Sequence, residues 1–340
     1  VIQSLHLGGG TPTFFKPENL RWLVNTLLEE ATVHPHADFS FEGHPNNTTY
    51  EHLQALHEVG FRRVSFGVQD LDMKVQQTIH RIQPFENLEA VTTAARNLGY
   101  TSVSYDLVYG LPFQTPFTVA DTVKKIINLQ PDRIAFYSYA HVPWLKPGQR
   151  GYSSSDLPSA GLKRHLYDIG KHLLRRNGYH DVGMDHFALR HDELFKAHVS
   201  GTLHRNFMGY TTVKTDVLIG LGASAISDVY LAYAQNKKGV AEYMDTVKKT
   251  GFAVDKGHLL TDEDFVIRQC ILSLICKRHV EASLLSVVMN DYIAEQLAEM
   301  EEYGMLYCNT NGLFITTAGE PFIRNICRLF DKSINKVSMT

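Results

Sequence analysis

The sequence predicts an α/β fold in which parallel strands alternate with covering helices. Short apolar strands and amphipathic helical segments alternate through the first half of the chain, and each strand–helix unit spans about 30 residues, the length of a βα repeat. Each of these strands also ends near glycine or polar residues, as expected where parallel strands build a ligand site. The repeat alone fits a barrel or a doubly wound sheet.

Five strands are expected in this first half. They cover residues 2–7, 38–42, 63–68, 102–108 and 132–138. Helical patterns lie between them, near residues 17–30, 48–58, 72–80, 86–98 and 117–128. Gly60 and Gly99 follow helix ends, where a left-handed cap is favoured. Thr48, followed by Glu51, predicts a capping box at the start of the second helix.

The rest of the chain is less regular and predicts a second, mainly helical domain. One helix is expected near 161–176, and others follow at 261–277 and 291–303. A hairpin turned at Asn311-Gly312 precedes a final helix. Helices with a small hairpin predict a winged-helix-like domain, but no basic face favours nucleic-acid binding. We place the two domains at residues 1–255 and 256–340.

Composition agrees with an ordinary globular protein. Of 340 residues, 44% are hydrophobic and 20% charged, and the net charge of -3 argues against a broad nucleic-acid-binding face. No apolar run approaches the roughly 18 residues of a membrane span. The four cysteines predict free thiols in a reducing, cytoplasmic compartment; they are Cys270, Cys276, Cys308 and Cys327.

The strand ends supply the candidate binding groups. The first strand ends in Gly8-Gly9-Gly10-Thr11, Glu42 and Gln69 end the next two, and Asp106 lies within the fourth. Because the carboxyl ends of parallel strands meet at one edge, we expect these groups to share one mouth. The glycine triplet matches neither a P-loop nor GxGxxG, so neither a nucleoside triphosphate nor a dinucleotide is expected. Bare backbone still permits the close approach of a small polar ligand.

Each candidate also has a structural interpretation. Asp106 is costly to bury without a partner, so it serves either a ligand or a structural salt bridge. Arg81, in "QTIHRIQPF", is either a ligand-binding cation or a solvated helix residue. Glu42 and Gln69, taken singly, favour neither interpretation.

The chain resembles the oxygen-independent coproporphyrinogen III oxidase family of radical S-adenosylmethionine (SAM) enzymes. The resemblance is carried, in order, by "LHLGGGTPT", "GVQD", "YDLVYGLPFQT", "PDRIAFYSYAHVPW", "GMDHFA", "LHRNFMGYTT", "GASAIS", "AQN" and "IRNICRLFD". GGGTP and YGLP are shared with a haem-chaperone branch, whereas "GMDHFA" with "HRNFMGYTT" is specific to the oxidase branch. The resemblance implies a partial, open (β/α)6 barrel, here without its first strand, followed by a mainly helical C-terminal domain.

The resemblance also implies a SAM site across the carboxyl ends of the strands. The glycine segment corresponds to the part that receives the methionine amino and carboxylate groups, and Arg81 to the arginine that pairs with the carboxylate. Acids and an amide surround the ribose and amine, and Ala140 matches an adenine contact. The expected SAM-binding residues are Gly9, Gly10, Thr11, Glu42, Gln69, Arg81, Asp106 and Ala140. A second SAM or substrate pocket is implied at Val108, Phe207, Met208 and Ile226.

The implied reaction is the oxidative decarboxylation of two propionates of coproporphyrinogen III to vinyl groups, which gives protoporphyrinogen IX. It uses a [4Fe-4S] cluster, a 5′-deoxyadenosyl radical formed from SAM, and an unidentified electron donor. The family's cluster-binding CxxxCxxC is absent from this sequence. We therefore expect the cluster cysteines upstream of Val1, no metal ligand in this chain, and no activity of the chain as given. His186, His204 and Arg205 are candidates for the substrate carboxylates.

Two related functions remain open. A haem chaperone of the same superfamily would need its own His-containing motif in place of "HRNFMGYTT", and no such motif is visible. Another haem-directed radical SAM enzyme is the second possibility. In each case we expect a cytoplasmic monomer that binds no nucleic acid and has no membrane span.

Overall fold

A computed structural model describes residues 1–331 of the chain. The chain divides into two compact units, the first beginning at Val1 and the second at Ala197. This division precedes the expected domain boundary at residue 255, because the strands between residues 217 and 259 pair with one another inside the second unit. The compact units are defined by contacts, so the domain boundary at residue 255 stays a prediction. Each unit is described by itself.

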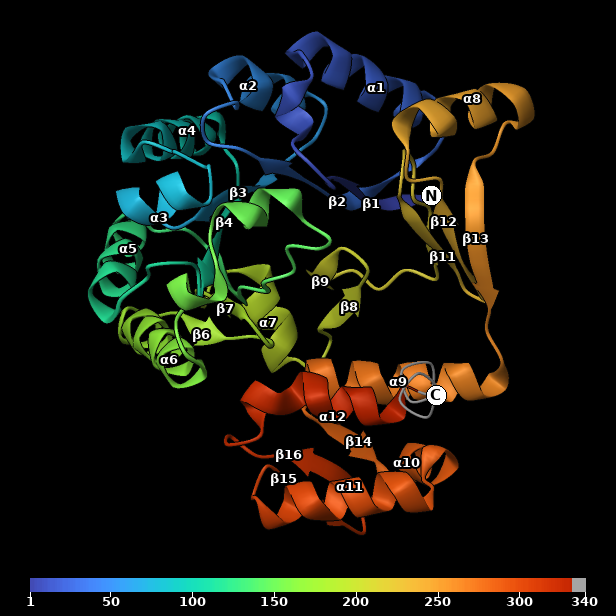
Figure 1. Cartoon of the computed structure of the whole chain (residues 1–340). Helices are drawn as coiled ribbons and strands as arrows, with labels where there is room; N and C mark the ends of the chain where they lie inside the picture. The colour runs from blue at the N-terminus through green and yellow to red at the C-terminus, as the bar shows by residue number, and fades with distance from the viewer. Residues whose placement is uncertain (332–340) are drawn as a thin grey trace. The chain divides into compact units, whose positions relative to one another are not determined.

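A seven-stranded sheet forms the centre of the first unit (Figure 1). Its order is β1-β2-β3-β4-β5-β7-β6, and β1 to β5 run parallel in sequential order. A doubly wound sheet reverses its strand order at a switch point, so the sequential order favours the barrel. The strands are β1 (Ile2–Leu7), β2 (Val33–Gly43), β3 (Arg63–Gln69), β4 (Ser102–Tyr109), β5 (Arg133–Ser138), β6 (His180–Asp181) and β7 (His186–Ala188).

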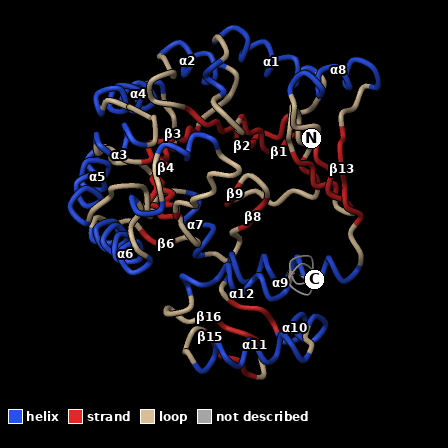
Figure 2. The backbone as a smooth tube through the Cα atoms, in the orientation of Figure 1, coloured by secondary structure: helices blue, strands red, loops and turns tan. Residues whose placement is uncertain are grey.

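The sheet is open, because β1 and β6 form its two edges. Helices lie along its outer face (Figure 2). They are α1 (Pro17–Glu29), α2 (Tyr50–Glu58), α3 (Met73–Thr78), α4 (Phe85–Leu98), α5 (Pro116–Asn128) and α6 (Ala160–Arg176). A further helix, α7 (Glu193–Val199), contains the boundary between the two units. Short 3₁₀ helices occupy Pro12–Phe14, Pro147–Gly151 and Ser154–Asp156. The predicted partial barrel is confirmed.

Alternation along the strands separates a core face from an inner face. In β3, Val64, Phe66 and Val68 are buried, whereas the intervening Ser65 and Gly67 are only half-buried. The buried face packs with the outer helices in one core cluster. Each fully buried large apolar side chain stabilises the fold by roughly 1.5–3 kcal/mol, so this face fixes the helices and leaves the inner face to polar groups.

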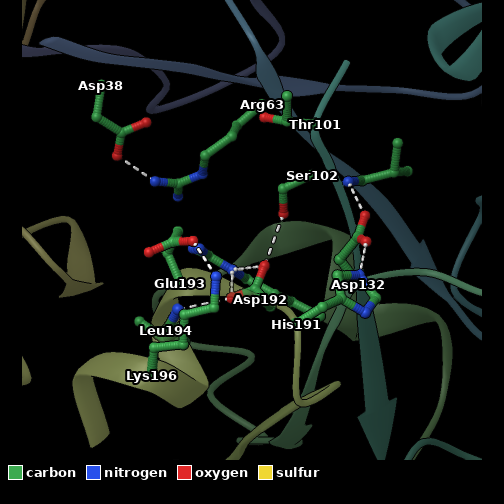
Figure 3. A network of polar contacts seen from close by, with 12 residues as sticks. Asp38, Arg63, Thr101, Ser102, Asp132, His191, Asp192, Glu193, Leu194 and Lys196 are labelled. Atoms are coloured by element: carbon green, nitrogen blue, oxygen red, sulfur yellow. Dashed lines mark hydrogen bonds and ion pairs between the residues drawn. The ribbon is translucent and has the colours of Figure 1, made fainter. Parts of the chain in front are cut away.

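One half-buried and one buried ion pair involve arginines at the amino ends of β3 and β5 (Figure 3). Arg63 pairs with Asp38, and Arg133 Nε lies 2.7 and 2.8 Å from the two carboxylate oxygens of Asp192. Ser102 Oγ donates to Asp192 Oδ2 at 3.1 Å. Burial and the nearby Arg133 lower the pKa of Arg63 to about 10. Each of these arginines therefore has a carboxylate partner within the protein.

Two local predictions are off by one residue. The capping box of α2 begins at Thr49 and closes with His52, whereas Thr48 is buried and hydrogen-bonds Thr13 instead. The hairpin turn consists of residues 310–311 rather than Asn311-Gly312, because Gly312 already pairs with Asn309. The left-handed glycine that ends α4 is confirmed, with φ of 93° at Gly99.

The second unit begins with a hairpin and a four-stranded antiparallel sheet. The hairpin is β8 (His204–Asn206) and β9 (Gly209–Thr211). The sheet is β10 (Val217–Leu218), β11 (Ile226–Val229), β12 (Ala232–Asn236) and β13 (Val254–Leu259), with α8 (Val240–Thr250) between its last two strands. The sequence did not predict this sheet.

A winged-helix-like arrangement follows, as predicted. A helix, a strand, two helices and a two-stranded hairpin succeed one another, and the three strands form one sheet. The elements are α9 (Asp262–Lys277), β14 (His279–Glu281), α10 (Ala282–Val288), α11 (Asp291–Glu302), β15 (Leu306–Asn309) and β16 (Gly312–Ile315), followed by a 3₁₀ turn (Glu320–Phe322) and α12 (Ile323–Phe330). Within residues 1–331, no helix has both the length and the apolarity to cross a bilayer.

Candidate functional site

The predicted acids lie on the inner face, toward the carboxyl ends of β2 and β4, with β3 between them. The register pairs His6 with Ser40, Glu42 with Ser65, and Gly67 with Asp106. Residues two apart on a strand share a face, so Glu42 lies on the same face as Ser40, and Gly67 on the same face as Ser65. The sheet therefore brings the ends of β1 to β4 together, as the sequence predicted.

Glu42 links the first two strand ends. The Gly9 N–H donates to Glu42 Oε2 at 3.3 Å, and His6 Nε2 lies 3.5 Å from Glu42 Oε1. His6 Nδ1 in turn lies 2.9 Å from Ser40 Oγ. A side chain at Gly8 would place its Cβ 2.5 Å from His6 Nε2, so the His6 ring would have to shift to accommodate it.

The glycine loop after β1 presents bare backbone to open space. Gly9 has φ of +81°, a conformation that favours glycine. A Cβ at Gly9 or Gly10 would meet no atom within 4 Å, so packing against the protein does not explain the missing side chain at Gly10. Thr11 is half-buried and precedes the 3₁₀ turn without capping it through its side chain. The open backbone fits a small ligand with polar groups.

Asp106 has a strongly perturbed ionisation. Burial, followed by the negative charge of Glu42, raises the pKa of Asp106 to about 7, although Ser65, Arg81 and His6 oppose the shift. Its hydrogen-bond donor is Ser65 Oγ, at 3.3 Å from Oδ1, rather than a cation. The structural salt-bridge interpretation of Asp106 is therefore wrong.

Arg81 lies in the loop between α3 and α4, so its interpretation as a solvated helix residue is wrong. Its Nη2 donates to the Gly67 carbonyl at 2.8 Å, whereas its Nε is buried without a hydrogen-bond partner among the described residues. Burial lowers the pKa of Arg81, and Asp106 opposes that shift. A buried unsatisfied donor costs about 1–3 kcal/mol, a cost that a carboxylate ligand would remove.

Gln69 ends β3 in an irregular conformation. The β3–β4 register shifts between Gly67 and Gln69, which marks a β-bulge, and Gln69 has φ of 69°. Non-glycine residues with such angles concentrate at binding sites, and bulges redirect side chains there. A Cβ at Gly67 would lie 2.8 Å from Arg81 Nη2 and 3.0 Å from Gln69 Nε2, so both side chains lie beside this glycine.

The fifth strand contributes backbone beyond its end. Ala140 is exposed and follows β5 by two residues. The preceding Tyr139 is fixed, because its N–H donates to the Tyr109 carbonyl at 2.8 Å and its carbonyl accepts from Lys163 Nζ at 2.5 Å. Val108 lies on the inner face of β4, opposite Tyr137 in the register. His186 in β7 has its Nε2 3.5 Å from the Tyr137 hydroxyl.

The other candidates belong to the second unit. Phe207 and Met208 form the exposed turn of the β8–β9 hairpin, and the Phe207 ring lies 5.1 Å from the Tyr233 ring. The Arg205 guanidinium lies 4.8 Å from the Tyr210 ring. Burial, with the charges of Lys214 and Arg268, lowers the pKa of His204. The second pocket, which includes Ile226 at the start of β11, stays a prediction, as do the substrate contacts.

The described cysteines do not fit an iron–sulfur cluster. Cys270, Cys276 and Cys327 are buried, and burial raises the pKa of each, whereas cluster ligation needs thiolates. Cys308 is exposed. Residues 1–331 contain no group of three or more His, Cys, Asp or Glu side chains that could hold a metal ion.

Comparison with known proteins decides the family. Residues 2–126 match the radical SAM superfamily. The oxygen-independent coproporphyrinogen III oxidase of Pseudomonas aeruginosa is 39% identical over 343 residues, covering 98% of this chain and 74% of the relative. The chain belongs to the oxygen-independent coproporphyrinogen III oxidase family. The relative of the same name from Escherichia coli is 38% identical over 337 residues, covering 97% of this chain and 74% of its own length.

A solved structure of this oxidase family has the same fold. Coproporphyrinogen III oxidase from Escherichia coli, a radical SAM enzyme, matches with a TM-score of 0.92 and 38% identity, covering 97% of this chain and 78% of that chain. Family membership confirms the predicted radical SAM fold and enzyme class, with SAM and a [4Fe-4S] cluster as cofactors. The ligands of that cluster are not among the residues described.

The candidate site contains three residues that the sequence analysis missed. His6 contacts Glu42, Ser65 donates to Asp106, and the Gly67 carbonyl accepts from Arg81. Strand alternation could have identified His6 and Ser65, because they lie two residues before Gly8 and Gly67 and so share a face with them. The role of Gly67 depends on the loop that carries Arg81, which no local pattern predicts.

Proposed function

We propose that this chain carries the SAM-binding core of an oxygen-independent coproporphyrinogen III oxidase. The substrate is coproporphyrinogen III, and two of its propionate side chains become vinyl groups in haem biosynthesis. The observation that carries the proposal is the meeting of Glu42, Asp106 and the partly unsatisfied Arg81 beside an open glycine loop. The similarity to oxidases of that name along nearly the whole chain supports the choice of substrate.

The methionine half of SAM fits Arg81 and the glycine loop. The buried Arg81 Nε is an unused donor in a planar guanidinium, which suits a carboxylate. Gly9 and Gly10 leave room for the ligand where a side chain would project. When bound, SAM supplies the 5′-deoxyadenosyl group that removes hydrogen from the propionate.

Glu42 and Asp106 fit the ribose hydroxyls and the ammonium group. Both carboxylates accept hydrogen bonds, and their proximity keeps Asp106 partly protonated near neutral pH in the free protein, where burial raises the pKa of Asp106 to about 7. A positively charged ligand favours the ionised form, so binding near pH 7 expels a proton from Asp106. Gln69 and Ala140 complete the site in this proposal.

The substrate contacts form a separate part of the proposal. Coproporphyrinogen III carries four carboxylates, and basic side chains favour such a ligand. We assign this role to His186, His204 and Arg205. Arg205 Nη1 is buried without a hydrogen-bond partner among residues 1–331. Val108, Phe207, Met208 and Ile226 are assigned to the second pocket. An electron donor, a monomeric state and a cytoplasmic location remain parts of the proposal.

The full-length protein, loaded with its cluster, tests this function. It should convert coproporphyrinogen III to protoporphyrinogen IX under anaerobic conditions with SAM and a chemical reductant, as measured by chromatography of the oxidised porphyrins. The Arg81→Gln variant, loaded to the same iron content, should lose the activity because it lacks the proposed partner of the SAM carboxylate. Stoichiometric haem binding without decarboxylation by the wild type would contradict the proposal and favour a haem chaperone.

A further inference from the structure

The segment after β5 is held by a side-chain amide that the sequence analysis did not single out. Gln149 Nε2 donates to the Ala140 carbonyl at 3.1 Å, and the Val142 N–H donates to Gln149 Oε1 at 2.6 Å. Gln149 itself is half-buried in the 3₁₀ helix Pro147–Gly151. One side chain thus contacts the backbone on both sides of His141.

This pattern reproduces the hydrogen bonding of a parallel strand. In a parallel ladder, one residue donates to the carbonyl before its opposite residue and accepts from the N–H after it. The Gln149 amide makes these two bonds around His141, although β5 ends at Ser138. The Gln149 side chain therefore takes the place of a neighbouring strand and holds the backbone that follows β5.

The surrounding contacts brace the segment from other directions. Lys163 Nζ bonds the Tyr139 carbonyl, and Arg150 Nε donates to the Pro143 carbonyl at 3.1 Å. Among residues 1–331, no hydrogen bond engages the N–H groups of Ala140 and His141. Gln149 therefore bonds the Ala140 carbonyl and the Val142 N–H, and it leaves the N–H groups of Ala140 and His141 in a fixed orientation for a ligand.

We propose that Gln149 is a positioning residue that fixes the backbone of residues 140–142 to recognise the adenine of SAM. This inference rests on the proposed SAM site, in which Ala140 contacts the base. Adenine presents an exocyclic amine as donor and ring nitrogens as acceptors, which backbone groups match only in a defined orientation. Hypoxanthine carries a carbonyl in place of the amine, so a rigid backbone discriminates the two bases and a loosened one does not.

The test measures binding rather than turnover. S-adenosylhomocysteine and S-inosylhomocysteine are titrated calorimetrically into the full-length, cluster-loaded protein under anaerobic conditions. The wild type should bind the adenine compound more tightly. Gln149→Leu has a similar size and removes both bonds, so affinity for the adenine compound should fall roughly tenfold, or about 1.4 kcal/mol, while affinity for the inosine compound changes little. The preference should fall toward unity.

Two further variants separate positioning from folding. Gln149→Glu keeps the acceptor for the Val142 N–H but turns a carboxylate toward the Ala140 carbonyl, so its preference should lie between those of the wild type and Gln149→Leu. Gln54→Leu makes the same change at an exposed α2 residue that bonds Glu58, and it should keep the wild-type preference. The melting temperature of each variant is recorded beside the titrations.

The outcomes distinguish the two levels of the proposal. A wild type that binds neither compound would refute the SAM site itself, and with it this inference. A wild type that prefers adenine, with Gln149→Leu keeping the full preference or weakening both compounds equally, would overturn the role of Gln149 alone. Loss of the preference with retained binding of both compounds supports it.

Discussion

Replacing Asp106 with asparagine should stabilise the ligand-free protein, and increasingly so as the pH rises. Burial raises the pKa of Asp106 from 3.8 to about 7, so between these values the folded protein binds more protons than the unfolded chain. Stability that is present below pH 3.8 is therefore lost progressively until the pH reaches about 7. At about 1.4 kcal/mol per pH unit, the cumulative cost is about 4 kcal/mol.

The asparagine side chain in this variant would carry no charge and could still accept a hydrogen bond from Ser65. The free energy of unfolding of Asp106→Asn should therefore exceed that of the wild type by about 3 kcal/mol more at pH 8 than at pH 5. Urea unfolding of both proteins at the two pH values, followed by fluorescence, measures this difference. Asp168→Asn is the control, because Asp168 is exposed and pairs with Arg164 on the same helix.

A constant difference between Asp106→Asn and the wild type from pH 5 to pH 8 would refute the assigned ionisation. The same variant should bind S-adenosylhomocysteine more weakly, because an amide accepts a hydroxyl hydrogen bond less strongly than a carboxylate does. A gain in stability together with a loss of affinity is expected when a binding residue is buried at a cost to the stability of the fold.

Three other substitutions test separate parts of the account. In Gly10→Ala the new Cβ meets no protein atom within 4 Å, so the free energy of unfolding should change by less than about 0.5 kcal/mol. Affinity for S-adenosylhomocysteine should fall roughly tenfold, and an unchanged affinity by calorimetry would show that the glycine loop does not contact the ligand. Arg81→Lys should weaken that ligand roughly ten- to a hundredfold, because an ammonium cannot pair in the guanidinium geometry; equal affinity in the same titration would exclude the carboxylate contact. Asp192→Ala leaves Arg133 buried without its carboxylate and should lower the free energy of unfolding by about 3–5 kcal/mol; a free energy of unfolding within about 1 kcal/mol of the wild type, measured with urea, would show that the pair is not structural.

The sequence could predict the first unit because its signals are local and repeated. Alternation in segments such as 63–69 identifies both the strand and the two faces, and the strand-end position of Glu42 and Asp106 follows from parallel pairing. The choice between barrel and doubly wound sheet depends on strand order, which no local pattern contains. The binding role of Arg81 was predicted only from the family resemblance, because the local sequence also fits a solvated helix residue.

The second unit shows where local signals fail. All six residues of β13 are exposed, so no buried alternation marks this strand in the sequence. Local signals also fail in the first unit at Gln149, whose two hydrogen bonds reach back seven and nine residues to backbone groups. Contacts of a side chain with distant backbone depend on the folded path of the loop, which composition does not determine.

A structure of the full-length, cluster-loaded protein with SAM bound would test the proposed SAM site most directly. We expect the ligand's carboxylate to contact Arg81, its ribose and amine groups to contact Glu42 and Asp106, and its methionine half to lie along Gly9 and Gly10. SAM bound away from the carboxyl ends of β1 to β5, with Arg81 Nε still unsatisfied, would contradict this expectation.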